Sequence, residues 1–211
     1  MKKYHKIPTI FKREESGKHK LIEGEYRSET IEQVKDLDWI FTEKIDGTNI
    51  RIYWDGHKVQ FNGRTDRAQL HQDLWKYLND TFCTDEIEEL FEQKFGEKEV
   101  YLFGEGYGAG IQKGGGYSKE KSFILFDAKI GGSYLDREEL KNLAESFNIS
   151  IVPVVLEGTI NDAISVVKTK NLSDIGDGSQ PFEGVVGRLK YGMYDRFGNR
   201  IIVKIKVKDF A

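Results

Sequence analysis

Two apolar stretches of this chain flank the sequence Thr42-Glu43-Lys44-Ile45-Asp46-Gly47-Thr48-Asn49. Residues 39–41 before it are apolar, and apolar residues alternate with polar ones after it, at positions 50, 52 and 54. Because Asp-Gly between two such stretches is a turn signal, the pattern predicts two strands joined by a tight turn. Lys44 would then lie at a strand end, with its amine facing a cleft. Short patterns of this kind also occur in turns that have no chemical role.

The composition is that of a soluble globular protein. The 211 residues are 38% hydrophobic, 32% charged and 12% aromatic, which excludes a disordered or fibrous chain. The sequence contains neither an apolar run long enough for a membrane span nor the apolar core of a signal peptide. One cysteine, Cys83, excludes an intramolecular disulfide and favours a reducing compartment. We therefore expect a cytoplasmic protein with no membrane partner, folded as a single domain over residues 1–211.

Charge is distributed unevenly along the chain. The net charge of −3 argues against a protein that coats nucleic acid with its whole surface. Residues 1–20 carry seven Lys or Arg against two Glu, and residues 184–208 carry seven against one Asp. Basic ends suit a local phosphate-binding face. Ordinary solvated surfaces would give the same counts.

Periodicity predicts an α+β fold. Helical spacing of apolar residues predicts helices near residues 29–35, 69–95 in one or two pieces, 136–147 and 161–169. Alternation and short apolar runs predict strands near 58–61, 100–103, 122–126, 151–156, 184–189 and 201–207. Since strands outnumber helices and lie far apart in the sequence, we expect largely antiparallel sheets flanked by helices.

Carboxylates and lysines recur at predicted strand ends. Glu105 and Glu183 each follow an apolar run and precede a glycine, so each can reach into a cleft. Alternation puts Lys204 and Lys206 on one face of their strand, with apolar residues 203 and 205 in the core. Unpaired buried ammonium groups are costly, so these lysines favour an anionic partner. An edge strand with two solvated lysines is the alternative.

The order and spacing of these segments resemble the motifs of the covalent nucleotidyltransferase superfamily, which includes ATP- and NAD-dependent ligases and mRNA capping enzymes. The matching segments are residues 42–49, 63–65, 102–106, 123–127, 182–186 and 202–207. The resemblance covers nearly the whole chain and implies an ATP-grasp-like ligase adenylation domain. Asn49 stands where DNA ligases and capping enzymes usually have arginine, which resembles RNA ligases, and among them the nick-sealing phage enzymes.

The resemblance implies a role for each matching residue. Lys44 would be the catalytic nucleophile, and Glu183 would bind the divalent metal. Lys204 and Lys206 would place positive charge beside the Lys44 amine. The remaining residues would bind nucleotide or RNA: Glu43 at the adenine, Asn49 at the incoming strand end, Arg64 at ribose or the nick phosphate, Glu105 at ribose, Phe126 stacked on the purine, and Lys204 and Lys206 at the α-phosphate.

The implied activity is ATP-dependent RNA ligation in RNA repair. With Mg²⁺ or Mn²⁺, Lys44 would take AMP from ATP and pass it to an RNA 5′-phosphate, and a 3′-hydroxyl would then displace AMP. The implied partner is RNA with 5′-phosphate and 3′-hydroxyl ends, nicked or bridged. Because the sequence ends at Ala211, we expect no C-terminal accessory domain, which leaves room for a separate RNA-binding partner. A minimal DNA ligase, a guanylyltransferase and a nucleotide-binding module without catalysis are the alternatives.

Overall fold

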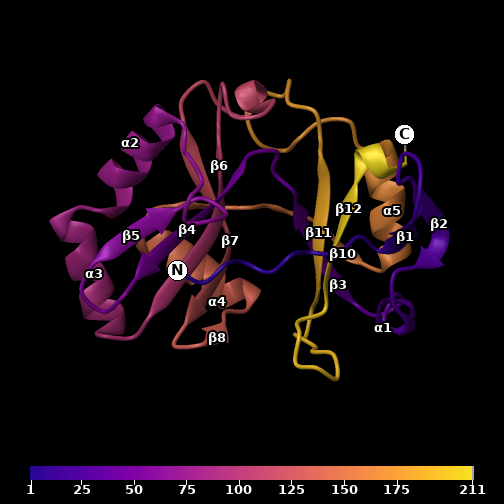
Figure 1. Ribbon diagram of the computed structural model, residues 1–211, viewed down its shortest axis with the longest axis horizontal. Coiled ribbons are helices and arrows are strands. Elements are labelled where there is room, and N and C mark those ends of the chain that lie inside the picture. Colours follow the sequence, from indigo (N-terminus) through magenta and orange to yellow (C-terminus); the bar gives the residue numbers. More distant parts are fainter. Residues whose placement is uncertain (211) are drawn as a thin grey trace. The chain divides into compact units, whose positions relative to one another are not determined.

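The computed structural model describes residues 1–210, which form two compact units, each with its own hydrophobic core (Figure 1). Unit 1 comprises residues 1–5, 46–152 and 175–180. Unit 2 comprises residues 6–45, residues 153–174 and the chain from residue 181 onward. None of the helices in this described part is long and apolar enough to cross a membrane.

Unit 1 is built on a six-stranded sheet with the strand order β5-β4-β6-β7-β8 and with β9 paired to β7. The strands are β4 (Thr48–Trp54), β5 (Val59–Asn62), β6 (Val100–Tyr107), β7 (Ser122–Ile130), β8 (Ser133–Tyr134) and β9 (Ser150–Ile151). All pairs are antiparallel except β7 with β9. Three helices cover one face of this sheet, namely α2 (Gln72–Phe82), α3 (Asp85–Phe95) and α4 (Arg137–Ser146). No helix of the described chain covers the other face within this unit.

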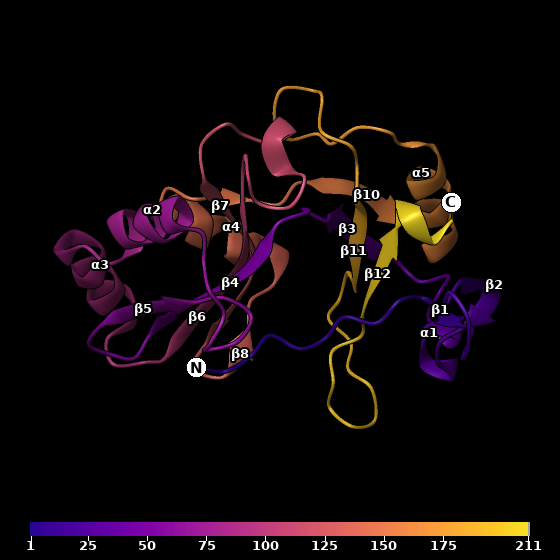
Figure 2. The ribbon, with the colours of Figure 1, turned by 45° about the horizontal axis from the view of Figure 1, so that its top comes forward.

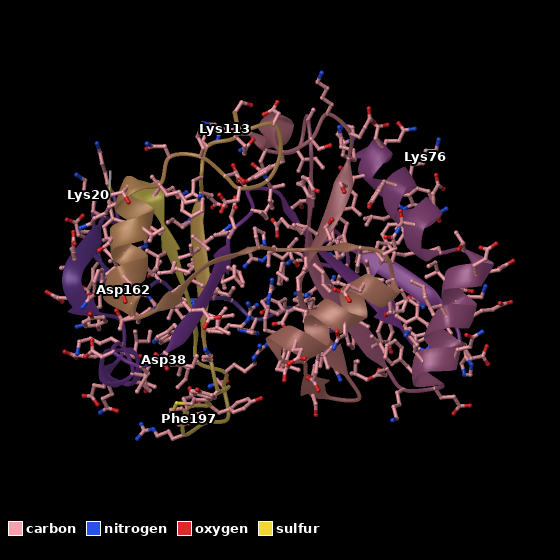
Figure 3. All side chains as sticks on the ribbon, turned by 180° about the vertical axis from the view of Figure 1, so that it is seen from behind. Lys20, Asp38, Lys76, Lys113, Asp162 and Phe197 are labelled. Carbon is pink, nitrogen blue, oxygen red and sulfur yellow. The ribbon has the colours of Figure 1, made fainter. Side chains whose placement is uncertain are left out.

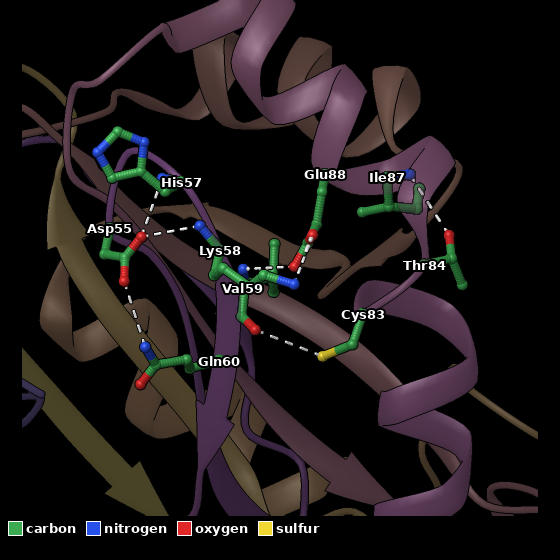
Figure 4. A network of polar contacts seen from close by, with 9 residues as sticks. All are labelled: Asp55, His57, Lys58, Val59, Gln60, Cys83, Thr84, Ile87 and Glu88. Carbon is green, nitrogen blue, oxygen red and sulfur yellow. Dashed lines mark hydrogen bonds and ion pairs between the residues drawn. The ribbon is translucent and has the colours of Figure 1, made fainter.

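The start of α3 is fixed to β5 by a polar network (Figure 4). Thr84 caps the helix by accepting a hydrogen bond from the Ile87 N–H at 3.4 Å. One oxygen of Glu88 accepts from the Val59 N–H at 3.0 Å, and the Cys83 thiol donates to the Val59 carbonyl at 3.7 Å. Burial raises the pKa of Cys83. The one cysteine of the chain is therefore a packing residue.

Unit 2 is built on a four-stranded antiparallel sheet with the strand order β10-β3-β11-β12 (Figure 2). These strands are β3 (Trp39–Glu43), β10 (Val154–Gly158), β11 (Gly184–Leu189) and β12 (Ile202–Lys206). One face packs on α5 (Ile160–Thr169), on α1 (Glu29–Gln33) and on a hairpin of β1 (Phe11–Arg13) and β2 (Leu21–Tyr26). Each unit also contains one short 3-10 helix among its described residues, at Gly114–Gly116 in unit 1 and at Val207–Asp209 in unit 2.

The predicted α+β class, with antiparallel sheets flanked by helices, is confirmed. Helix α4 begins as predicted, because Asp136 forms a reciprocal capping box with Glu139. The single strand predicted over residues 151–156 is wrong. That segment contributes β9 to one sheet and β10 to the other, and the break falls at Pro153, which has no N–H to continue a ladder. The β1–β2 hairpin was not predicted, since its strands are short and their apolar residues do not alternate with polar ones.

Candidate active site

Lys44 directly follows β3 and meets Glu183 at the end of the sheet in unit 2. The Lys44 N–H donates to the Gly184 carbonyl at 2.9 Å, which extends the β3–β11 ladder by one residue. The side chain then reaches Glu183, with its Nζ donating to Oε2 at 2.7 Å. Both side chains are partly buried. Strand register thus joins two groups that lie 139 residues apart in the sequence.

Strand β12 carries Lys204 and Lys206 on the face opposite the core. Val203 and Ile205 belong to the core of unit 2, so the predicted alternation is confirmed. Lys206 lies opposite Gly184, the residue that bonds Lys44. Both lysines therefore lie on the helix-free face of the sheet, at the end where Lys44 and Glu183 meet.

Lys204 and Lys206 are half-buried cations without a carboxylate partner. Desolvation, followed by the charge of neighbouring lysines, lowers the pKa of each. For Lys204 those neighbours include Lys206 and Lys44. Over residues 1–210, no carboxylate lies within ion-pair distance of either Nζ. Concentrated positive charge of this kind favours a bound anion, such as a phosphate group.

Glu43, next to Lys44, points into the protein. Its carboxylate is buried, accepts from the Ser173 hydroxyl and accepts from the Asp174 N–H at 3.1 Å. Burial raises the pKa of Glu43, and these two hydrogen bonds act against that rise. Glu43 thereby fastens residues 173–174 to β3. Sequence inspection missed Ser173, because no local pattern connects it with a residue 130 positions away.

In unit 1, Asn49 and Glu105 lie opposite each other on the helix-free face of the sheet. The two residues are register partners on β4 and β6. The Asn49 Oδ1 atom is buried without a hydrogen-bond partner among the described residues. The turn before β4 needs glycine, since a Cβ on Gly47 would lie 2.4 Å from the Gly106 carbonyl oxygen. Gly47 and Asn49 therefore lie directly against Glu105 and Gly106 of β6.

Phe126 occupies a bulge in β7. Phe103 pairs with Asp127 while Gly104 pairs with Leu125, so Phe126 is the extra residue between them. The Tyr4 ring lies 5.1 Å from the Phe126 ring in an edge-on arrangement, and the Tyr4 hydroxyl donates to Asp127 at 2.6 Å. Tyr4 and Asp127 therefore fix the local position of Phe126. Neither residue was predicted to have this role, because Tyr4 and Asp127 lie 123 positions apart in the sequence.

Arg64 is exposed in the turn that follows β5. That turn is held by Arg51, a fully buried arginine on the helix-free face of the sheet. Arg51 donates to the Gly63 carbonyl and to Asp66, each at 2.8 Å, and to the Met1 carbonyl at 2.9 Å. Arg51 was not among the residues predicted from the sequence. The available signal was an arginine between the apolar residues of a predicted strand.

The motif residues thus fall into two sets. Lys44, Glu43, Glu183, Lys204 and Lys206 lie in unit 2. Asn49, Arg64, Glu105 and Phe126 lie in unit 1.

The described residues offer few side chains that could bind a metal ion at this site. Within residues 1–210, no group of three or more His, Cys, Asp or Glu side chains could hold a metal ion. Glu183 supplies one carboxylate beside the cationic face. Mg²⁺ commonly binds through one or two carboxylates, with waters and substrate phosphates as its other ligands. The residues present therefore fit a metal that arrives with a nucleotide.

Comparison with known protein families decides the identity. Residues 37–206 match the family model described as RNA ligase, and this match covers most of the chain and both units. The chain belongs to the RNA ligase family.

Solved RNA ligases share the fold. A Naegleria gruberi RNA ligase with pyrophosphate matches with a TM-score of 0.64 and 20% sequence identity, over 86% of this chain and 52% of that one. A lysine-to-alanine variant of that enzyme with ATP and manganese gives a TM-score of 0.63 at 20% identity, over 86% and 52% of the two chains. This chain therefore shares the fold of these solved RNA ligases, and it spans about half of their length.

Proposed function

We propose that this chain is an ATP-dependent RNA ligase that works through a lysyl-AMP intermediate on Lys44. The observation that carries the proposal is the Lys44–Glu183 contact of 2.7 Å beside Lys204 and Lys206, which have no carboxylate partners in the described chain. A nucleophile for an α-phosphate needs such a cationic setting. Solved relatives containing ATP, AMP with manganese, or pyrophosphate support the same chemistry.

In the first step, Lys44 Nζ attacks the α-phosphorus of ATP. A phosphorus–nitrogen bond forms and the bond to pyrophosphate breaks, so the amine must lose a proton before or during attack. Glu183 Oε2 is already a hydrogen-bond acceptor for that amine and is placed to orient it. Lys204 and Lys206 would stabilise the charge that develops on the phosphate oxygens. In this step the protein would mainly position the reacting groups and neutralise the charge on the phosphate oxygens.

The other motif residues would recognise the nucleotide and the RNA ends. Phe126 would stack on the adenine, and Glu105 would accept a hydrogen bond from the ribose. Asn49 has a buried amide oxygen available for a donor, which suits contact with the incoming strand end. Arg64 is exposed, as a phosphate-binding arginine must be. Glu43 would contribute to adenine recognition indirectly, by holding residues 173–174 in place through hydrogen bonds.

A divalent metal, Mg²⁺ or Mn²⁺, would be held by Glu183 and phosphate oxygens, and it would neutralise phosphate charge. In the later steps, AMP passes to an RNA 5′-phosphate, and a 3′-hydroxyl displaces AMP to seal a nicked or bridged strand. We further propose that residues 1–211 act as one adenylation domain in the cytoplasm. The family match across both units and the single cysteine support these points.

The test is the intact mass of the protein after incubation with ATP and Mg²⁺. We expect the parent chain to gain the mass of one AMP, and Lys44→Ala to gain none. Lys141→Ala, which removes an exposed lysine on α4, is the matched control and should be adenylated like the parent. An AMP adduct on Lys44→Ala would overturn the assignment of the nucleophile.

Adduct formation and the sealing of nicked oligonucleotides together separate the alternative functions. An adduct from GTP in preference to ATP would indicate a guanylyltransferase. Faster sealing of nicked DNA than of nicked RNA would indicate a minimal DNA ligase. If ATP, GTP and NAD all give no adduct, the chain is a nucleotide-binding module without catalysis and the ligase proposal is wrong.

A further inference from the structure

The loop between β11 and β12, residues 190–201, gathers exposed aromatic side chains in unit 2. Tyr191 is 82% exposed, Phe197 75% and Tyr194 57%, and Met193 between them is also exposed. Figure 3 labels Phe197 at the outer end of this loop. Single exposed apolar residues are ordinary, but several in one short segment indicate an interaction surface.

The β11–β12 loop is held in shape by its own hydrogen bonds. Asp195 Oδ1 accepts from the N–H of Phe197 at 2.8 Å and from the N–H of Asn199 at 2.9 Å. The Asp195 N–H in turn donates to the Asn199 carbonyl at 2.8 Å. Hydrogen bonds from Asn199 lower the pKa of Asp195, so the carboxylate stays ionised in the turn. An ordered turn presents the rings at a smaller entropic cost on binding than a flexible loop would.

The charge of the loop indicates the chemistry of its partner. The loop contains Arg196 and one acid, Asp195, which is already bonded within the turn. The side chain of Lys190, at the start of the loop, is paired with Glu157 of β10 at 2.7 Å. The Arg196 guanidinium lies 4.7 Å from the centre of the Phe197 ring. Aromatic rings interleaved with arginine are the combination that binds unpaired nucleic acid, because bases stack on the rings while cations meet the phosphates. A purely apolar partner would not need the cations.

The loop continues the catalytic sheet of unit 2. Strand β11 runs from Gly184, whose carbonyl bonds Lys44, to Leu189, where the loop begins. Five residues at about 3.3 Å each give a separation of roughly 17 Å. With about 3.4 Å per nucleotide along one strand, this corresponds to about five nucleotides. Arg188, two positions along β11 from the residue opposite Lys204, lies on the same helix-free face.

We infer that, on a bridged RNA, the β11–β12 loop binds an unpaired stretch by stacking Tyr191, Tyr194 and Phe197 on bases about five nucleotides from the ends that are joined. The inference takes RNA and the joined ends from the proposed function. The loop itself lies outside the residues that act on ATP. Loss of RNA binding and loss of adenylation can therefore be measured separately.

The experiment combines Tyr191→Ser, Tyr194→Ser and Phe197→Ser in one chain and measures binding of fluorescent 5′-phosphorylated RNA by anisotropy. Each stacked base contributes roughly 5-fold or more to affinity, so loss of three rings should weaken the binding of unpaired 12-mers by at least about 100-fold. Oligonucleotides of four residues, too short to reach the loop, should bind the variant and the parent alike. Adenylation by ATP should be unchanged.

Two further variants sharpen the test. Trp75→Ser removes an aromatic side chain of similar exposure, 52%, on α2, and it should bind the 12-mer as the parent does. Asp195→Ala keeps the rings but removes the bonds that order the loop, so it should lose only part of the affinity.

Equal binding of the 12-mer by the triple variant and the parent would overturn the inference. A parent that dimerises, with a monomeric triple variant and unchanged RNA affinity, would instead make the loop a contact between copies. If no chain is adenylated, the proposed function fails while the binding comparison still decides the role of the loop.

Discussion

The cations on the two helix-free sheet faces have opposite environments. On the face in unit 1, Arg51 is fully buried, but backbone carbonyls and Asp66 accept its hydrogen bonds. On the face in unit 2, Lys204 and Lys206 are only half-buried, have lowered pKa values and lack carboxylate partners in the described chain. The paired cation holds the fold together. The unpaired cations are available for a ligand.

The difference has an energetic basis. A buried charge is tolerated when nearby groups satisfy it, and removing that charge then leaves its partners unsatisfied. Lysines crowded together without partners instead cost folding free energy, and a bound phosphate relieves that cost. The same contrast predicts which substitution damages activity and which damages stability.

The largest effect is expected for Lys204→Met. It should slow formation of the AMP adduct by about 100- to 1000-fold, as removal of a single stabilising group from a developing oxyanion does. Thermal stability without nucleotide should stay equal or rise, by up to about 1 kcal/mol, because a poorly solvated cation has been removed. Adduct formation is followed by intact mass and stability by calorimetry. Lys208→Met, which alters a neighbouring exposed lysine, is the control. A Lys204→Met chain that unfolds more easily but adenylates normally would reverse the comparison.

The next effect is expected for Arg51→Met. Loss of the guanidinium leaves the carbonyls of Met1 and Gly63 without their donor, and it should lower the free energy of unfolding by about 3 kcal/mol. Urea unfolding at constant temperature measures this change, with Arg67→Met as the control for an exposed arginine in the same unit. The folded fraction should still form the AMP adduct. A stable Arg51→Met chain without adenylation would place Arg51 in the chemistry instead.

The smallest effect is expected for Glu43→Gln. The amide can accept from the Asp174 N–H and donate to the Ser173 hydroxyl, so stability at pH 7 should change by less than about 1 kcal/mol. The folded protein raises the pKa of Glu43, so it binds that proton more tightly than the unfolded chain does. This contribution to stability is present below the unfolded value of about 4.3 and is lost as pH rises through the folded pKa.

Urea unfolding across this pH range measures the effect. In the parent, the free energy of unfolding should decline as the pH rises, and in Glu43→Gln the part of that decline caused by Glu43 should be absent. Glu43→Ala, which leaves two donors unsatisfied, should be the less stable of the two variants at every pH. An unchanged pH profile in Glu43→Gln would mean that another carboxylate causes the decline.

Several local features were predictable because they depend on spacing alone. Alternation along β12 put Val203 and Ile205 in the core and left Lys204 and Lys206 outside. The capping residues Asp136 and Glu139 lie three positions apart, so the start of α4 needs no distant contact. Motif order along the chain was sufficient to predict the family, and the match over residues 37–206 confirms it.

Other features depended on which strands pair and in which register. The segment 151–156 alternates like one strand, yet Pro153 divides it between two sheets. The bulge at Phe126 and the burial of Arg51 also arise from neighbouring strands and from the chain near Met1. Such partners lie too far away in the sequence for any periodic pattern to reveal them.

The sequence by itself determined the class of the fold, the faces of its strands and the family, because each is encoded by short-range periodicity and motif order. Only the tertiary structure decided that Lys44 contacts Glu183, that Glu43 is bound by Ser173 and that Arg51 is satisfied while Lys204 is not. The physical reason is that burial and pairing are properties of groups brought together by β-sheet register, as Lys44 and Glu183 are across 139 residues of sequence.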